Sequence, residues 1–338
     1  ATIIDPKSEF HNKTQDILIE NGTITKIGSR ITNSNNYEVI KTDNLHVSQG
    51  WFDSSVCFAE PGYEERETID NGLKTSALSG FTAVAVNPNT NPIVDSNSDV
   101  AFLKNKAKGN SVDLYPIGAL TREAKGEELA ELFDMKNAGA VAFGDYKKET
   151  SNTNLMKIAL QYGSNFDGLI LSFPFDTKVA AKGVMNEHIQ STKLGLKGIP
   201  NLSEELRVVR DLYLLEYTNG KLHIPTISTA KSVELIREAK AKKLNVSCSV
   251  AIHNLFLNDS NLETFDANYK VLPPLRTQND IDALIDGLKD GTIDMVTTDH
   301  NPLDVEHKNL EFDRATFGSI GLEAAFGALN AILPTKTV

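Results

Sequence analysis

Residues 222–252 read LHIPTISTAKSVELIREAKAKKLNVSCSVAI and contain one complete strand–helix–strand repeat. The apolar, β-branched runs LHIPTIS (222–228) and NVSCSVAI (245–252) flank residues 230–243, where apolar side chains recur every three to four positions. The two runs have the length of buried strands, and the stretch between them has the period of a helix. This order predicts two parallel strands joined by a helix that covers them.

The same alternation extends in both directions from this repeat. Strands are expected at eight apolar runs: 49–57, 81–86, 112–118, 140–145, 168–173, 222–228, 245–252 and 294–299. Helices are expected at 65–79, 122–136, 152–163, 203–218, 230–243 and 278–288, with Ser203 as the cap of the fourth. Eight β–α pairs fit a closed (β/α)8 TIM barrel better than an open sheet, and such a barrel carries its chemistry at the C-terminal ends of the strands.

The N-terminal residues have a different character. DILIENGTITKIG (16–28) alternates apolar and polar side chains around Asn21-Gly22, a dipeptide typical of a tight β-hairpin. Little before residue 48 has helical period. We therefore expect a small β unit at 1–47, part of a larger β domain, and the barrel at 48–338.

Composition excludes several classes of function. The formal charge of −11 and the absence of basic runs argue against nucleic-acid binding. No apolar stretch is long enough to cross a membrane, and the first residues do not have the pattern of a signal peptide. Cys57 and Cys248 lie in separate apolar segments and suggest no disulfide framework. These features predict a cytoplasmic protein.

The strand ends offer few catalytic groups. Asp145, His253 and Asp299 are ordinary metal-ligand types, but no two of them form a short-range chelate. His300 follows Asp299 directly, so the two side chains point to opposite faces of a strand, and His300 is interpreted as a hydrogen-bonded support. No Gly-X-Ser-X-Gly elbow and no glycine-rich phosphate loop is present.

Several stretches, in order, resemble the type I dihydroorotases of the amidohydrolase superfamily. They are DILIENGTITKIG, QGWFDSSVCFAEPGYEERETI, SALSGFTAVAVNPNTNP, GVMNEHIQSTKLGLKGIPNLSEELRVVRDLYL, LHIPTISTAKSVELIREAK, YKVLPPLRTQNDIDAL and DMVTTDHNPLDVEHK. The resemblance implies a barrel of the metal-dependent hydrolase type, a β domain completed by strands after the barrel, and a binuclear zinc site. It also implies that the C-terminal strands are missing from the chain as given.

The resemblance implies that most metal ligands have been replaced. Ser55 and Cys57 stand where the family has the two histidines of Asp-X-His-X-His, and Thr226 replaces the histidine of the sixth strand. The fifth-strand histidine falls at Ser172 or Phe173. The following remnants could still hold zinc or another divalent ion, as a weak or vestigial site: Cys57, Asp145 and Asp299, with Tyr146 as the alternative to Asp145.

The resemblance also bears on substrate contacts. Asn89 matches the substrate-binding asparagine, and His253 matches the first histidine of a Pro-His-His-Leu loop. Ala59 and Leu303 replace the arginine and histidine that would contact the substrate, whereas Asp299, the catalytic proton carrier, is retained.

Three functions remain open from the sequence. The first is a non-catalytic homologue, a homodimer without cofactor, that supports aspartate transcarbamoylase. The second is an active cyclic amidohydrolase, converting dihydroorotate to N-carbamoyl-aspartate on a reduced metal site. The third is a repurposed barrel that binds another small molecule through Asn89, Arg276 and His253. Arg276 is otherwise interpreted as a salt-bridged loop residue, and Lys147 and Lys148 as solvated side chains.

Overall fold

The computed structural model describes residues 1–333, so the last five residues of the expected barrel domain lie outside the described part. Contacts along the chain divide it into two compact units, Ala1–Trp51 and the chain from Phe52 onward. Each unit is described by itself.

The N-terminal unit is built from two small sheets. β1 (Thr2–Ile4) pairs in parallel with β4 (His46–Ser48), and β2 (Asp16–Glu20) forms an antiparallel hairpin with β3 (Thr23–Gly28). Asn21 and Gly22 both have positive φ, 52° and 75°, as the predicted tight turn requires. Ile3 is the one buried hydrophobic residue in this unit. The unit therefore has almost no core of its own.

The second unit contains the eight predicted strands in a single parallel sheet, whose order follows the chain. The strands are β5 (Trp51–Val56), β6 (Phe81–Val86), β7 (Asp113–Gly118), β8 (Ala142–Phe143), β9 (Ile170–Leu171), β12 (Leu222–Ile224), β13 (Val246–Ala251) and β14 (Met295–Thr297). Each of these lies within one of the runs identified in the sequence. The fold is the predicted α/β barrel.

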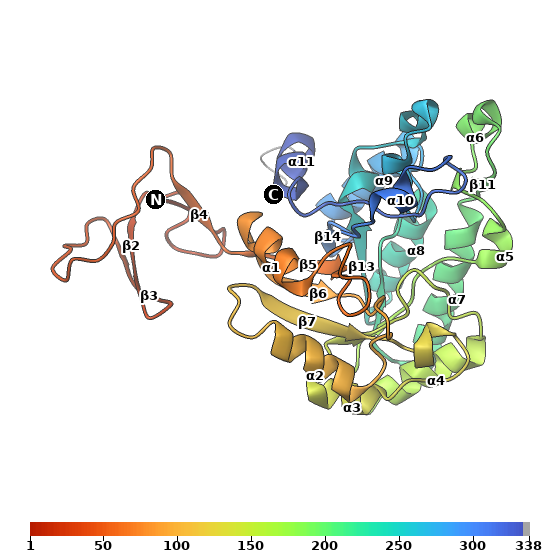
Figure 1. The fold of residues 1–338 in the computed structure, drawn as a ribbon, viewed down its shortest axis with the longest axis horizontal. Coiled ribbons are helices and arrows are strands. Elements are labelled where there is room, and N and C mark those ends of the chain that lie inside the picture. The colour runs from red at the N-terminus through yellow and green to blue at the C-terminus, as the bar shows by residue number, and fades with distance from the viewer. Residues whose placement is uncertain (334–338) are drawn as a thin grey trace. The chain divides into compact units, whose positions relative to one another are not determined.

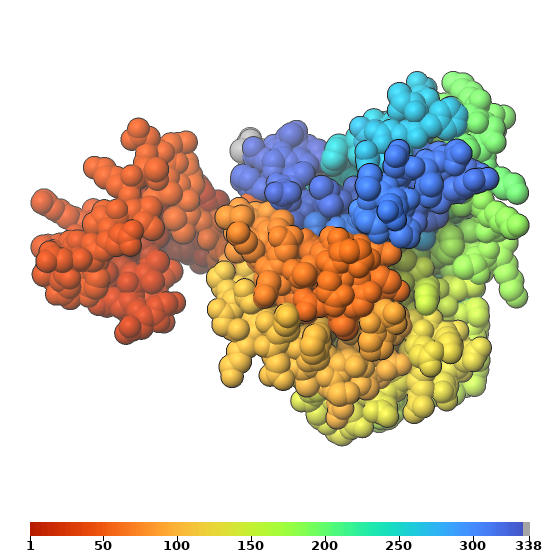
Figure 2. All heavy atoms as spheres, in the orientation of Figure 1, coloured from red at the N-terminus to blue at the C-terminus, as the bar shows by residue number. Residues whose placement is uncertain are grey.

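The first and last strands meet beyond their C-terminal ends. Val56 and His300 form a parallel bridge, and the Cys57 N–H donates to the His300 carbonyl at 2.7 Å. His300 also lies 2.9 Å from a carboxylate oxygen of Glu67 and accepts from the Gly321 N–H. Figure 2 shows the blue segment that follows residue 300 lying against the orange segment near residues 55–70. The hydrogen bonds close the barrel, and His300 has the supporting role expected of it.

Helices surround the strands (Figure 1). They are α1 (Ile69–Leu78), α2 (Asn97–Lys106), α3 (Leu132–Ala138), α4 (Thr153–Ser164), α5 (Thr177–Ala180), α6 (Ile189–Leu194), α7 (Leu202–Thr218), α8 (Ala230–Ala241), α9 (Gln278–Lys289), α10 (Val305–Lys308) and α11 (Ala325–Ile332). Neighbours along the ring pack against each other, α4 against α7, α7 against α8 and α8 against α9. No helix in residues 1–333 is long and apolar enough to span a membrane.

Several features depart from the sequence expectations. The helix expected at 122–136 is not continuous, because the 3-10 turn Arg122–Ala124 and α3 (Leu132–Ala138) are separated by non-helical residues. α2 (Asn97–Lys106) was not among the expected helices. Ser203 does not cap α7, because the helix begins one residue earlier and the Ser203 hydroxyl donates instead to the Asp176 carbonyl. The long connection between β9 and β12 contains a small parallel pair, β10 (Met185–Asn186) and β11 (Gly198–Ile199), which the sequence did not suggest. Four short 3-10 helices complete the described elements: Arg122–Ala124, Ile252–Leu255, Asp259–Thr264 and Ala267–Tyr269.

Candidate functional site

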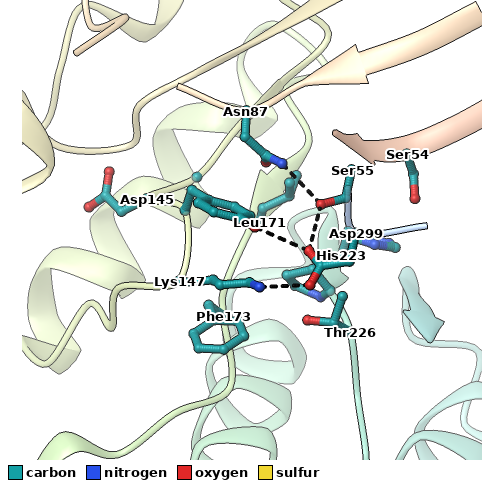
Figure 3. A pocket seen from close by; sticks show the side chains of 13 residues that line it. Ser54, Ser55, Asn87, Asp145, Lys147, Leu171, Phe173, His223, Thr226 and Asp299 are labelled. Carbon is teal, nitrogen blue, oxygen red and sulfur yellow. Dashed lines mark hydrogen bonds and ion pairs between the residues drawn. The ribbon is translucent and has the colours of Figure 1, made fainter. Parts of the chain in front are cut away.

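A small cavity lies at the barrel mouth, where residues from the ends of six strands converge. Its volume is about 30 Å³, and its lining consists of Ser54, Ser55, Asn87, Gly144, Asp145, Tyr146, Lys147, Leu171, Phe173, His223, Pro225, Thr226 and Asp299. Figure 3 shows most of these side chains and the bonds that connect them. A cavity of this size holds about one water molecule.

Asp299 is the centre of the hydrogen-bond network. Its side chain is 1% exposed, and one carboxylate oxygen lies 2.7 Å from the Lys147 ammonium. The other oxygen accepts from the Tyr146 hydroxyl at 3.2 Å and from the Ser55 hydroxyl at 3.4 Å. The Lys147 ammonium also lies 5.1 Å from the centre of the Tyr146 ring. Asp299, to which the resemblance implies a catalytic role, is therefore held in an ion pair with Lys147.

The expectation that Lys147 is solvated is wrong. Only 11% of its side chain is exposed, whereas Lys148, the next residue, is exposed and donates to the Ala124 carbonyl. Lys147 has a φ of 51°, in the left-handed region, which redirects the chain after β8. Residue type alone did not reveal this turn.

The Asp145 carboxylate forms its hydrogen bonds away from Asp299. Its carboxylate accepts from the backbone N–H groups of Leu120 and Thr121 at 3.0 and 3.1 Å and from the Thr121 hydroxyl. In Figure 3 it points away from Asp299, whereas Tyr146 donates to Asp299. Burial raises the pKa of the Asp145 carboxyl group. Of the two residues left open by the sequence, Tyr146 is the one that contacts the Asp299 carboxylate.

Cys57 lies close to this hydrogen-bond network, and its side chain is a neutral thiol. Burial raises its pKa to about 12, so the thiolate that zinc requires is disfavoured at neutral pH. Asn87 donates to the Ser55 hydroxyl at 3.0 Å, and its amide nitrogen lies 3.8 Å from the Cys57 sulfur. Asn87 thus connects the two positions where the family has histidines.

The other replaced positions carry no strong ligand. Phe173 and Thr226 line the cavity, and Thr226 donates its backbone N–H to the Ser249 hydroxyl. Ser172 points to Asp211, whose carboxylate accepts from the Ser172 hydroxyl at 2.6 Å. Of the two candidate positions at the fifth strand, Phe173 is therefore the one that lines the cavity, and its side chain is an aromatic ring.

The expected substrate contacts do not line this cavity. Asn89 and His253 each have a buried polar atom, Oδ1 and Nε2, without a hydrogen-bond partner in the described structure. His253 lies at a second cavity of about 340 Å³, and burial lowers its pKa to about 4, so it is neutral. Arg276 is buried and donates to Ser228, Asn186 and the Ile199 carbonyl. Arg276 is therefore fixed between loops by hydrogen bonds rather than by a salt bridge.

The donors at the mouth do not fit the zinc site that the resemblance implies. Zinc sites in proteins need three or four converging histidine, cysteinate or carboxylate ligands. Within residues 1–333, no group of three or more His, Cys, Asp or Glu side chains is placed to hold a metal ion. Cys57, Asp145 and Asp299 do not form one, and an ammonium group contacts the Asp299 carboxylate at 2.7 Å.

Sequence reasoning missed four groups at the mouth or directly beneath it. Tyr146 was considered only as an alternative ligand, and Lys147 was assigned to solvent. His223 occupies the strand preceding Thr226, and its ring nitrogens lie 2.9 and 3.2 Å from the Ser247 and Ser249 hydroxyls. Asp53 is fully buried and accepts from Thr297 and Thr298. The position of Asp53 at the start of the Asp-X-His-X-His pattern was the signal for this carboxylate.

Solved structures with similar folds include hydantoinases (dihydropyrimidinases). The chain superposes on L-hydantoinase (dihydropyrimidinase) from Arthrobacter aurescens with a TM-score of 0.79, at 19% identity, covering 97% of this chain and 74% of that one. It superposes on D-hydantoinase (dihydropyrimidinase) from Thermus sp. with a TM-score of 0.78, at 21% identity, covering 98% and 75%. These likenesses show the class of fold, an α/β barrel.

Sequence comparison gives the family. The model of the Dihydro-orotase-like family matches residues 46–232. A dihydroorotase from Acetivibrio thermocellus is 44% identical over 324 residues, which is 96% of this chain and 76% of the relative. A dihydroorotase from Ruminiclostridium cellulolyticum is 45% identical over 325 residues, again 96% and 76%. The chain belongs to the dihydroorotase family.

Proposed function

We propose that this chain is a cytoplasmic dihydroorotase-like protein of pyrimidine biosynthesis that does not hydrolyse cyclic amides and acts as a non-catalytic partner of aspartate transcarbamoylase. The relatives named dihydroorotase support the place in pyrimidine biosynthesis. The observation that carries the loss of hydrolysis is the contact between Lys147 and Asp299.

Hydrolysis of a cyclic amide by this family requires an activated water and a free proton acceptor. A metal ion supplies the first by lowering the pKa of a bound water, and the donors at this mouth do not fit such an ion. Asp299 would supply the second, but its carboxylate is occupied by an ammonium group and two hydroxyl groups. The cavity of about 30 Å³ is also far smaller than the several hundred Å³ of ordinary ligand sites.

The first experiment measures metal content and hydrolysis on the same sample. Protein purified without chelator is equilibrated with zinc, analysed for bound metal and assayed with dihydroorotate, with the Acetivibrio thermocellus dihydroorotase as the active control. We expect less than about one tenth of a zinc ion per chain and no turnover above background. One or more tightly bound ions with metal-dependent turnover would establish the alternative, an active amidohydrolase with a reduced metal site.

The second experiment tests the partner. The chain is mixed with aspartate transcarbamoylase from the same organism and analysed by size-exclusion chromatography with light scattering. We expect the chain alone to be a homodimer and the mixture to elute as a larger complex. Separate elution of the two proteins at micromolar concentration would reject the partnership while leaving the absence of hydrolysis untouched.

A second candidate function, binding of another small molecule, is favoured by the cavity at His253. This cavity of about 340 Å³ is lined by apolar side chains such as Phe256 and Val271 and by the neutral imidazole of His253. Its buried Nε2 has no partner in the described residues and is available for a ligand hydrogen bond. A library of small heterocycles should then contain compounds that raise the melting temperature of the wild type but not of His253→Phe.

A further inference from the structure

We propose that Lys147 is a built-in cation that replaces the bound metal ion as the charge partner of Asp299, so that the barrel mouth is held together without metal. The inference rests on the proposed loss of metal chemistry at this site. It does not depend on the transcarbamoylase.

Asp299 is buried, and burial of a carboxylate is costly. Its side chain is 1% exposed, and a carboxylate removed from water in this way needs a partner of opposite charge. The two hydroxyl groups on Oδ1, from Tyr146 and Ser55, are neutral donors. The ammonium of Lys147, at 2.7 Å from Oδ2, is the cation in contact with this carboxylate in the described structure.

The backbone geometry brings the Lys147 ammonium into the barrel mouth. Lys147 and Asp299 both have a φ of 51°, although residues with side chains rarely adopt left-handed backbone conformations. Two such residues in direct contact indicate that the surrounding structure imposes the arrangement. In Figure 3 the Lys147 side chain extends across the cavity to Asp299.

Neighbouring side chains stabilise the Lys147–Asp299 pair. The Tyr146 ring lies beside the Lys147 ammonium at 5.1 Å, within the range of a cation–π contact, while its hydroxyl donates to Asp299. Asn87 donates to the Ser55 hydroxyl, which in turn donates to Asp299. Tyr146, Ser55 and Asn87 thus complement an ammonium–carboxylate contact, and a metal ion would have to displace the ammonium.

The experiment is a double-mutant cycle read by urea denaturation in the presence of a chelator. Lys147→Met leaves a buried carboxylate without a cation, and we expect the unfolding equilibrium to shift toward the unfolded state by about 100-fold or more. Asp299→Asn should shift the unfolding equilibrium by a similar factor, because it leaves the buried Lys147 ammonium without a carboxylate partner. The variant with both substitutions should be much more stable than the product of the two single effects predicts, because no uncompensated charge remains.

Lys148→Met is the matched control, since it makes the same chemical change at the adjacent exposed residue. We expect it to shift the equilibrium less than about threefold. If Lys147→Met does not fold, recovery of folding in the double variant supports the proposal, and failure of the double variant contradicts it. Additive single effects, or a wild type whose melting temperature rises with zinc, would also overturn it.

Failure of this proposal can be distinguished from failure of the proposed function. A wild type that hydrolyses dihydroorotate, or fails to bind the transcarbamoylase, contradicts the proposed function even if the cycle shows strong coupling. A cycle without coupling contradicts the role of Lys147 even if hydrolysis is absent.

Discussion

The buried side chain of His223 should make the stability of the barrel sensitive to acid. It is 5% exposed, and its ring nitrogens contact the hydroxyl groups of Ser247 and Ser249. Burial lowers its pKa to about 4, whereas an unfolded histidine titrates near 6.5. Between these values the unfolded chain binds more protons than the folded chain, so stability falls as the pH is lowered through this window.

We therefore predict that His223→Asn weakens the acid sensitivity of the fold. The histidine should contribute a loss of up to roughly 3 kcal/mol in the free energy of unfolding between pH 6.5 and pH 4. Urea denaturation at a series of pH values measures this, with the exposed His46→Asn as the control. Identical pH slopes in the wild type and His223→Asn would contradict the buried, neutral state of this ring.

The direction of single side chains explains why only part of the site could be predicted. Asp299 and Ser55 were expected at the mouth because both end a strand, and both line the cavity. Asp145 also ends a strand and lines the cavity, yet its carboxylate accepts from the backbone of Leu120 and Thr121 instead of joining the network around Asp299. Whether a side chain after a strand faces the cavity depends on one or two backbone angles, such as the φ of 51° at Lys147, and the residue types there do not dictate that angle.

At the scale of elements, α1 packs so closely on the segment before it that a favourable helix substitution should be harmful. Gly72 lies inside α1, where alanine ordinarily stabilises a helix by up to about 1 kcal/mol. A Cβ at Gly72 would lie 2.3 Å from the ring of Phe58, which is fully buried. The collision should outweigh the gain in helix propensity.

We predict that Gly72→Ala lowers the free energy of unfolding by about 1–3 kcal/mol, as overpacking of a core does. The matched control is Gly327→Ala in α11, where an added Cβ meets no atom within 4 Å and should be neutral or stabilising. Chemical denaturation of both variants provides the comparison. Gly72→Ala as stable as the wild type would mean that Phe58 can move aside.

α7 presents an apolar stripe on its outer face. All of its members are exposed, the two tyrosines most of all: Leu202 (49%), Leu206 (45%), Val209 (36%), Tyr213 (73%) and Tyr217 (72%). In an antiparallel pair of two such helices, the leucines at one end would face the tyrosines at the other. A two-fold symmetric interface requires this kind of self-complementary surface.

We therefore expect the proposed homodimer to form through α7. Tyr213→Lys should shift the chain toward a monomer in light scattering at micromolar concentration, because an ammonium would be placed in an apolar contact. Phe102→Lys, at an exposed aromatic residue of α2 (42%), is the control and should leave the dimer intact. A dimer that survives Tyr213→Lys would place the interface elsewhere.

For the whole molecule, the eight β–α pairs of the sequence predicted a closed barrel but not the residues that close it. The eight apolar runs are the eight strands, because parallel strands buried on both faces require continuous apolar segments. The bridge between Val56 and His300 joins residues far apart in the sequence, and no local pattern marks such a pair. The connection between β9 and β12 carries the pair β10–β11, whose two-residue strands are too short to give a periodic signal.

The charge of Lys147 is part of the polypeptide. A barrel that depends on zinc matures only after an ion has been delivered, and its folded population follows the supply of that ion in the cell. Here the cation beside Asp299 is present as soon as the chain has been synthesised. We therefore expect cells deprived of zinc to keep this protein folded and abundant, while the metal-dependent relatives lose their active sites.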